Sequence, residues 1–176
     1  MTTPIDTTWL QRSFPDLSDF RPLGQGGQKL VLAAKHGRDG EVVLKIVYPK
    51  TDPESVRREM LAVQQIQSPR VPRILEHGIA DTNIGTCVWL REEKVSGDTL
   101  RNILVAGPLP ADSVLRLGLQ MMEALESAER SQIVHRDVKP DNIMRNFAGD
   151  FGFWTSASLA ILTCHLSLRP LSLTAK

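Results

Sequence analysis

The segment from His135 to Asn142 constrains this chain more than any other part of its 176 residues. It places a carboxylate at Asp137, an ammonium group at Lys139 and a carboxamide at Asn142 within one short stretch. A carboxylate can accept a hydroxyl proton, an ammonium group can neutralise a transferring phosphoryl group, and an amide oxygen can bind Mg²⁺. The segment therefore predicts a site that brings a hydroxyl, a phosphoryl group and a magnesium ion together.

A long helix is predicted just before this segment, from about Pro110 to Arg130. Its leucine, valine and methionine side chains cover more than one face, which is typical of a helix buried on several sides. We expect the adjacent Met121 and Met122 to lie in its core contacts. The helix would hold the 135–142 segment at its C-terminal end.

A glycine cluster precedes both features. After an apolar start at Phe20, Leu23–Val31 contains Gly24, Gly26 and Gly27, a pattern that predicts a strand, a turn and a second strand. Glycine lets backbone N–H groups approach phosphate oxygens closely, although an ordinary hairpin turn has the same composition.

A lysine interrupts the next apolar run. Lys45 stands in the β-branched segment Glu41–Val47, where burying it is costly unless it has a partner; the alternative is an edge-strand lysine pointing to solvent. A helix of about 13 residues is predicted after the capping segment Thr51–Glu54. Glu59, at the inner edge of its apolar stripe, is the best candidate partner for Lys45, although a solvated glutamate is the alternative. Residues 73–79 and 86–90 predict two further strands.

Together these segments resemble the catalytic domain of the protein kinases, in its Ser/Thr branch. The 135–142 segment matches the catalytic loop, with the glycine cluster about 110 residues upstream. The resemblance implies that Asp137 orients and deprotonates the acceptor hydroxyl, that Lys139 neutralises the γ-phosphate and that Asn142 binds Mg²⁺. It also implies that Lys45, held by Glu59, contacts the α- and β-phosphates of ATP. The remaining nucleotide contacts implied are Gly24, Gly26, Gly27, Val31, Val43 and the backbones of Glu93 and Val95.

Three positions depart from the family pattern. Lys29 replaces the third glycine of the loop, which either stiffens the loop tip or places a positive charge near the phosphates. Val43 stands where the family usually has alanine against the adenine, so two extra methyl groups crowd the base. Glu92 occupies the gatekeeper position, which is usually apolar or threonine, and a carboxylate there must either reach solvent or find a cation.

A second magnesium ligand is expected from an Asp-Phe-Gly triplet, and Asp150-Phe151-Gly152 is the one that the chain contains. It follows Asn142 by 8 positions (150 − 142), whereas the family spacing is about 13. In the family this interval holds two paired strands and their turn, so residues 143–145 would form the first strand, residues 146–149 the turn, and Asp150 would begin the second strand. Because a strand extends only about 3.3 Å per residue, Asp150 falls four or five residues short of the far end of that second strand. Asp150 is therefore a doubtful metal ligand, and we interpret the triplet as coincidental.

The resemblance implies an α+β fold with four parts. Residues 1–19 form an N-terminal arm, and residues 20–95 a small lobe with an antiparallel five-stranded sheet and one main helix. Residues 96–153 form an incomplete, mainly helical large lobe, and residues 154–176 a tail outside the family pattern. The missing part of the large lobe would leave an apolar face of the 111–130 helix uncovered, where a partner could dock.

Composition limits the other function classes. The net charge is +1 and no basic run is present, so neither nucleic acid nor an anionic membrane is implied as a partner. No apolar stretch has transmembrane length, and residues 1–6 lack the features of a signal peptide. The two cysteines, Cys87 and Cys164, favour reduced thiols in a cytoplasmic protein.

We therefore expect an ATP- and Mg²⁺-dependent kinase that phosphorylates Ser or Thr hydroxyls of a protein substrate, with activity impaired by the truncation. The alternative is a non-catalytic nucleotide-binding or interaction module derived from a kinase, which Lys29, Val43, Glu92 and the triplet spacing favour.

The tail generates a prediction about the gene. Phe153–Lys176 contains no Asp or Glu, and the codons for Phe153-Trp154-Thr155, shifted by two bases, must encode Leu-Asp. The codons that follow permit Phe-Gly-Leu-Ala-Arg, which puts an aspartate at the family spacing. We expect the coding DNA around codon 150 to encode a kinase activation segment in a second frame. Sequencing that region tests the idea, and finding no such segment in any other frame would refute it.

Overall fold

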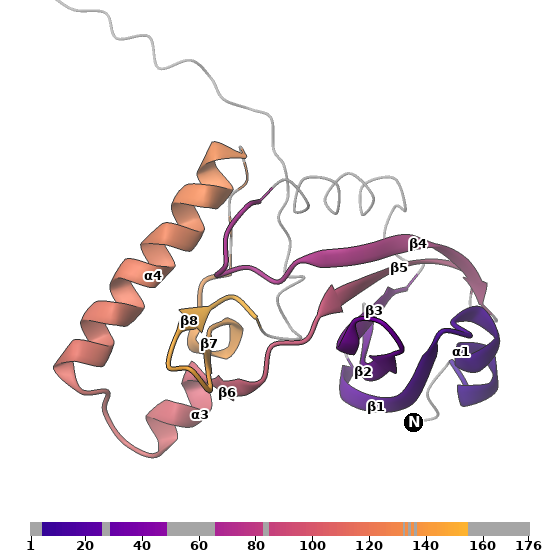
Figure 1. Ribbon diagram of the computed structural model, residues 1–176, viewed down its shortest axis with the longest axis horizontal. Helices are drawn as coiled ribbons and strands as arrows, with labels where there is room; N and C mark the ends of the chain where they lie inside the picture. The colour runs from indigo at the N-terminus through magenta and orange to yellow at the C-terminus, as the bar shows by residue number, and fades with distance from the viewer. Residues whose placement is uncertain are drawn as a thin grey trace, which may run out of the picture.

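The computed structural model describes residues 5–25, 29–48, 66–82, 85–131, 133, 135 and 137–154. One end of the molecule is a β-sheet flanked by a short helix, and the other contains a long helix beside a second, smaller sheet (Figure 1). Three features expected from the sequence lie outside the described residues, namely the glycine-loop tip with Gly26 and Gly27, the helix with Glu59, and the tail after residue 154.

The first sheet is five-stranded and antiparallel, as the sequence predicts, with the strand order β1-β2-β3-β5-β4. Its strands are β1 (Leu17–Gln25), β2 (Lys29–His36), β3 (Gly40–Val47), β4 (Ile74–Thr82) and β5 (Gly85–Glu93). Strand β3, whose apolar run is largely β-branched, is the central strand, and the apolar run of β2 lies beside it; the side chains of both runs are almost continuously buried.

The two faces of this sheet differ because side chains alternate along a strand. One face carries the core residues Leu30, Leu32, Leu44 and Ile46, on which the N-terminal segment packs through Leu10 and Phe14. That segment forms helix α1 (Thr7–Ser13), whose start is capped by Asp6 accepting a hydrogen bond from the Trp9 backbone N–H at 2.6 Å. The opposite face is left for the lysine-bearing positions of β2 and β3.

The chain then leaves β5 for a three-stranded sheet of order β6-β7-β8, made of β6 (Gly97–Thr99), β7 (Met144–Asn146) and β8 (Phe151–Gly152). The predicted hairpin near residues 143–150 is present, and its turn uses Gly149 at a φ of 88°, a conformation that favours glycine. The 3₁₀ turn η1 (Pro140–Asn142) precedes β7, so the catalytic-loop segment leads directly into this sheet.

Helix α3 (Leu100–Val105) and helix α4 (Ala111–Arg130) complete the described elements. The predicted long helix is thus present, but its burial is narrower than expected. Met121 is buried, whereas Met122 is 68% exposed, so the expectation that both lie in the core is wrong for Met122. The buried residues of α4, Met121, Ala124 and Ala128, lie along one stripe of the helix.

An apolar face of α4 is open to solvent in consequence. Its exposed side chains include Val114, Leu115, Leu119 and Met122. No helix among the described residues is both long enough and apolar enough to span a membrane.

Candidate active site

The side chains of Asp137, Lys139 and Asn142 converge in the structure. Asp137 Oδ2 lies 2.7 Å from Lys139 Nζ and accepts a hydrogen bond from Asn142 Nδ2 at 2.8 Å. Asn142 Nδ2 also donates to the Asp137 backbone carbonyl at 2.8 Å, so one amide group holds both the backbone and the side chain of Asp137. Asn142 is fully buried, whereas the side chains of Asp137 and Lys139 are 38% and 48% exposed, so an incoming group can reach the acid and the ammonium.

The charge state of this cluster follows from these contacts. The hydrogen bond from Lys139, followed by that from Asn142, holds the pKa of Asp137 below its usual range, so its carboxylate is ionised at neutral pH. The side-chain amide of Asn142 donates both of its hydrogen bonds to Asp137. Its Oδ1 is buried and has no hydrogen-bond partner among the described residues. A buried amide oxygen with free lone pairs suits a hard cation such as Mg²⁺.

Helix α4 ends just before this turn, and the intervening His135 is held by aromatic stacking. Its ring lies 4.2 Å from that of Phe153, centroid to centroid, at an interplanar angle of 25°. The Phe153 backbone N–H donates to the Arg70 carbonyl at 2.8 Å, and Phe153 belongs to the buried cluster that contains Met121. The turn is thus braced by β8 and by the segment that precedes β4.

Lys45 is on the sheet face opposite the α1 core, and its side chain is completely buried. Its Nζ lies 2.6 Å from Oε2 of Glu92, whose side chain is only 7% exposed. The gatekeeper carboxylate has therefore found a cation rather than reached solvent. The expected pairing of Lys45 with Glu59 remains a prediction because Glu59 lies outside the described residues.

Lys29 lies on the same face, because in the β2–β3 register Lys29 is opposite Val47 and Val31 is opposite Lys45. Burial, followed by the positive charge of Lys45, lowers the pKa of Lys29 to about 8; Glu92 acts in the opposite sense and Lys139 adds to the lowering. The pKa of Lys29 is therefore influenced by charges on the sheet and by Lys139 in the turn of residues 137–142, called the catalytic turn below. This favours the interpretation that the replaced glycine brings a positive charge into the site.

A cavity of about 420 Å³ opens between the sheet and the second half of the chain. Val43 and Val95, both expected to contact adenine, line it, and Leu23 of β1 and Met144 of β7 line it as well. The side chain of Trp154, 8% exposed, lies at its wall. Met144 and Trp154 were not predicted as site residues. The apolar position after the Asn142 turn could have indicated Met144, but nothing in the sequence indicated Trp154.

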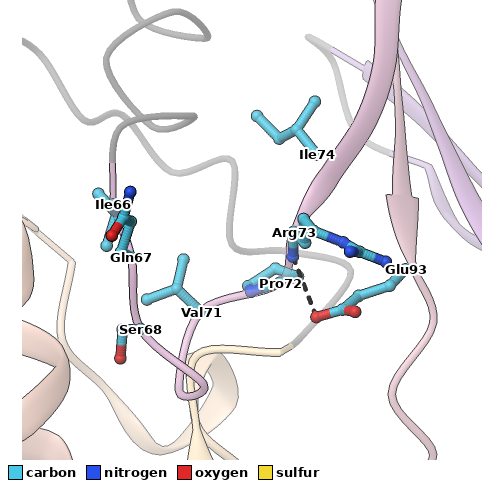
Figure 2. Close-up of a pocket in the computed structure, with 8 residues that line it drawn as sticks. All are labelled: Ile66, Gln67, Ser68, Val71, Pro72, Arg73, Ile74 and Glu93. Carbon is cyan, nitrogen blue, oxygen red and sulfur yellow. Dashed lines mark hydrogen bonds between the residues drawn. The ribbon is translucent and has the colours of Figure 1, made fainter.

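A second, wider pocket of about 670 Å³ lies beside the start of β4 and the end of β5. Figure 2 shows the carboxylate of Glu93 turned toward Arg73 at its wall, where Oε1 accepts a hydrogen bond from the Arg73 backbone N–H at 3.1 Å. The Glu93 backbone N–H in turn donates to the Arg73 carbonyl at 3.1 Å. The expected adenine contact of Glu93 would therefore have to come from its carbonyl oxygen.

Asp150 is engaged away from the Asn142 turn. Its Oδ1 accepts a hydrogen bond from Gln120 Nε2 at 2.7 Å and lies 3.5 Å from an Arg70 guanidinium nitrogen, while Gln120 Oε1 accepts from the Phe151 N–H at 2.7 Å. Phe151 is buried, and a Cβ on Gly152 would lie 2.7 Å from the Arg70 carbonyl. Packing thus accounts for each residue of the triplet.

The other predicted site residues fall into two groups. Gly24 lies in β1 with open space where a Cβ would project, and Val31 is buried opposite Lys45. Gly26, Gly27 and Glu59 lie outside the described residues, so their expected contacts stay predictions.

The lowered pKa of Lys29 predicts a pH dependence of nucleotide affinity. Above a pH of about 8 Lys29 loses its charge, so the affinity for Mg-ATP should fall as the pH rises through that value. Calorimetric titration with Mg-ATP from about pH 7 to about pH 9.5 measures this effect. In Lys29→Met the fall should disappear, whereas Lys35→Met, on the exposed part of the same strand, should retain it. An unchanged fall in Lys29→Met would contradict the assignment.

The contacts of Asp150 predict a structural effect of its removal. Asp150→Ala should lower the free energy of unfolding by about 1 kcal/mol, because the hydrogen bond from Gln120 is lost. Mg²⁺-dependent ATP affinity should stay within about twofold of that of the unsubstituted chain, a change of less than about 0.5 kcal/mol. Denaturant unfolding and ATP titration with and without Mg²⁺ measure the two effects, with Asn142→Ala as the comparison. Loss of the Mg²⁺ dependence in Asp150→Ala alone would assign the metal to Asp150.

Comparisons with known proteins agree with this geometry. The family model described as the protein kinase domain matches residues 17–159. The chain is 35% identical over 142 residues to a probable serine/threonine-protein kinase of Clostridium perfringens, an alignment that covers 74% of the chain and 20% of that protein. It is 33% identical over 156 residues to the serine/threonine-protein kinase PrkC of Bacillus subtilis, covering 82% of the chain and 24% of the relative.

A third relative, the serine/threonine-protein kinase PknB of Mycobacterium leprae, is 32% identical over 155 residues, covering 82% of the chain and 23% of that protein. The chain thus spans about a fifth to a quarter of the length of these curated relatives. With a family match over most of its length and the catalytic turn assembled as described, the chain belongs to the protein kinase domain family.

Proposed function

We propose that this chain catalyses, or derives from an enzyme that catalyses, ATP-dependent phosphorylation of Ser or Thr hydroxyls in a protein substrate. The observation that carries the proposal is that Lys139 Nζ and Asn142 Nδ2 converge on Asp137 Oδ2, at 2.7 Å and 2.8 Å. Catalysis of phosphoryl transfer is mainly positioning and charge stabilisation, and these three groups supply both.

Asp137 is the group that would orient the acceptor hydroxyl and accept its proton. Its contacts with Lys139 and Asn142 keep it ionised and fix its direction, and its partial exposure gives a substrate hydroxyl access. The proton would pass from the hydroxyl oxygen to the Asp137 carboxylate while that oxygen forms its bond to the γ-phosphorus. The bond between the γ-phosphorus and the bridging oxygen would break at the same centre, and ADP would leave with the electron pair. Lys139, at 2.7 Å from Asp137, would neutralise charge on the transferring group.

The cavity beside Val43 and Val95 would hold the adenine, with Leu23 and Met144 contributing apolar contacts. The phosphates would extend toward Lys45 and under the loop of Gly24, Gly26 and Gly27. Asn142 would hold Mg²⁺ through its unpaired Oδ1, and the bound ion would supply further neutralisation of phosphate charge. The free, buried thiol of Cys87 supports a cytoplasmic setting for this reaction.

A second candidate is a non-catalytic nucleotide-binding module, and one observation favours it. The carboxylate of Asp150 is held by Gln120 and Arg70, so the Asp-Phe-Gly triplet of this chain directs its acid to helix α4. A chain that holds Mg²⁺ through one ligand instead of two would bind ATP yet transfer phosphate slowly.

Substitution of Asp137 tests the first candidate. Asp137→Asn should lower the phosphate-transfer rate to a generic Ser/Thr substrate by about 10²- to 10⁴-fold, because it removes the proton acceptor. The affinity for Mg-ATP should change little, since Asp137 acts on the hydroxyl rather than on the nucleotide. Transfer of radiolabelled phosphate and a thermal-shift titration with Mg-ATP measure the two effects.

The matched control is Asp141→Asn, in the same turn, whose carboxylate pairs with Arg101 on the surface at 3.1 Å. This variant should transfer phosphate at nearly the rate of the unsubstituted chain. Equal rates in both variants would refute the role of Asp137. ATP binding without any transfer by the unsubstituted chain would support the non-catalytic module.

A further inference from the structure

Among the described residues, the ammonium group of Lys45 is buried next to the carboxylate of Glu92, which comes from the sheet itself. Lys45 stands opposite Leu90 in the β3–β5 register, and Glu92 stands opposite Val43. Lys45 and Glu92 are therefore diagonal neighbours on one face of adjacent strands, a separation that two long side chains can span. Both residues belong to regular strands, so the backbone defines the origin of each side chain.

The geometry of the contact matters as much as its distance. Lys45 Nζ and Glu92 Oε2 are 2.6 Å apart, yet they are not aligned as a hydrogen bond, and Nζ has no hydrogen-bond partner among the described residues. The carboxylate balances the positive charge from one side. An ammonium group carries three N–H donors, so one carboxylate oxygen leaves donors for a further ligand. A fully buried ammonium group with remaining N–H donors can bind anionic oxygen atoms.

The surroundings of this pair are positive. Lys29 on β2 is a diagonal neighbour of Lys45 on β3. Burial, followed by the positive charge of Lys45, lowers the pKa of Lys29; Lys139 adds to the lowering and Glu92 opposes it. Glu92 thus lies within electrostatic reach of Lys29 as well as in contact with Lys45. Without its negative charge, the ammonium groups of Lys29 and Lys45 would repel each other in a poorly solvated site.

We propose that Glu92 is a positioning residue for nucleotide phosphate binding, which holds the Lys45 ammonium group in place on the sheet face opposite the α1 core. Glu92 acts through Lys45 and does not itself contact the phosphates. The inference rests on the proposed role of Lys45 as a phosphate ligand. It assigns a function to a carboxylate at a position where the family usually has an apolar side chain or threonine.

The test is a double-mutant cycle with two ligands. Glu92→Gln, Lys45→Met and the double variant are compared with the unsubstituted 176-residue chain, and calorimetry measures the dissociation constants of Mg-ATP and of adenosine. Glu92→Gln should weaken Mg-ATP binding by on the order of tenfold, because it removes the negative charge beside the buried Lys45 ammonium group. Adenosine has no phosphates, so its affinity should not change.

The Lys45→Met background separates positioning from general destabilisation. If Glu92 acts through Lys45, Glu92→Gln should cause no further loss of Mg-ATP affinity when Lys45 is already absent. Glu76→Gln is the matched control, since Glu76 pairs with Arg91 at 2.9 Å on a neighbouring strand of the same sheet. This control should leave both affinities unchanged.

Two further variants guard against loss of folding, which thermal unfolding would reveal. Glu92→Asp retains the charge at a shorter reach and should lose less Mg-ATP affinity than Glu92→Gln. The double variant Lys45→Met with Glu92→Leu replaces the buried pair by apolar side chains and should fold, because such replacements are often neutral or stabilising.

Glu59→Gln shows whether the helix glutamate also supports Lys45; the inference requires a loss in Glu92→Gln while Glu59 is intact.

Three results for Glu92→Gln would overturn the inference. They are unchanged or tighter Mg-ATP binding in Glu92→Gln, an equal loss for Mg-ATP and adenosine, and a loss that persists in the Lys45→Met background. If Lys45→Met itself leaves Mg-ATP binding unchanged, the phosphate role of Lys45 fails and the inference fails with it. If the cycle behaves as expected but no phosphate is transferred, the proposed catalytic function fails and the role of Glu92 stands.

Discussion

The burial of one lysine ammonium group in the middle of a β-sheet is the constraint around which this molecule is arranged. Lys45 is completely buried in a largely apolar strand, so a negative charge is needed nearby. Glu92 provides it from β5. Buried ion pairs add little net stability compared with apolar packing, because desolvation offsets the attraction between the charges. A buried pair at this position is consistent with the proposed role of Lys45 in binding phosphate.

The catalytic turn depends on a second set of contacts, which join the two halves of the chain. Arg70, just before β4, forms an ion pair with Glu123 of α4 at 2.9 Å, and its carbonyl accepts the Phe153 N–H. Phe153 then stacks on His135, two positions before Asp137. These contacts position the acid relative to the sheet that carries Lys45, and the electrostatic influence of Lys139 on Lys29 is consistent with that placement.

Helix α4 shows how far sequence pattern and burial can diverge. Its apolar residues surround the helix, which is typical of a helix packed on several sides. In the structure one stripe is covered, while Leu115, Leu119 and Met122 are more than half exposed. An amphipathic pattern indicates which surfaces are suited to burial, but the described residues supply a neighbour for only one of them. The prediction for Met122 was wrong because adjacent residues on a helix face different directions.

The sequence by itself determined the family, the five-stranded sheet, the long helix and the residue types of the catalytic turn, because local spacing and alternation encode these features. It also identified Glu92 as an anomaly and Asp150 as wrongly spaced. Only the tertiary structure decided that Glu92 pairs with Lys45, that Asp150 binds Gln120, and that Trp154 reaches the cleft wall. Each of these outcomes depends on strand register or on contacts between residues far apart in sequence, and pairing partners at such separations are set by how the elements pack, which no local pattern of residues records.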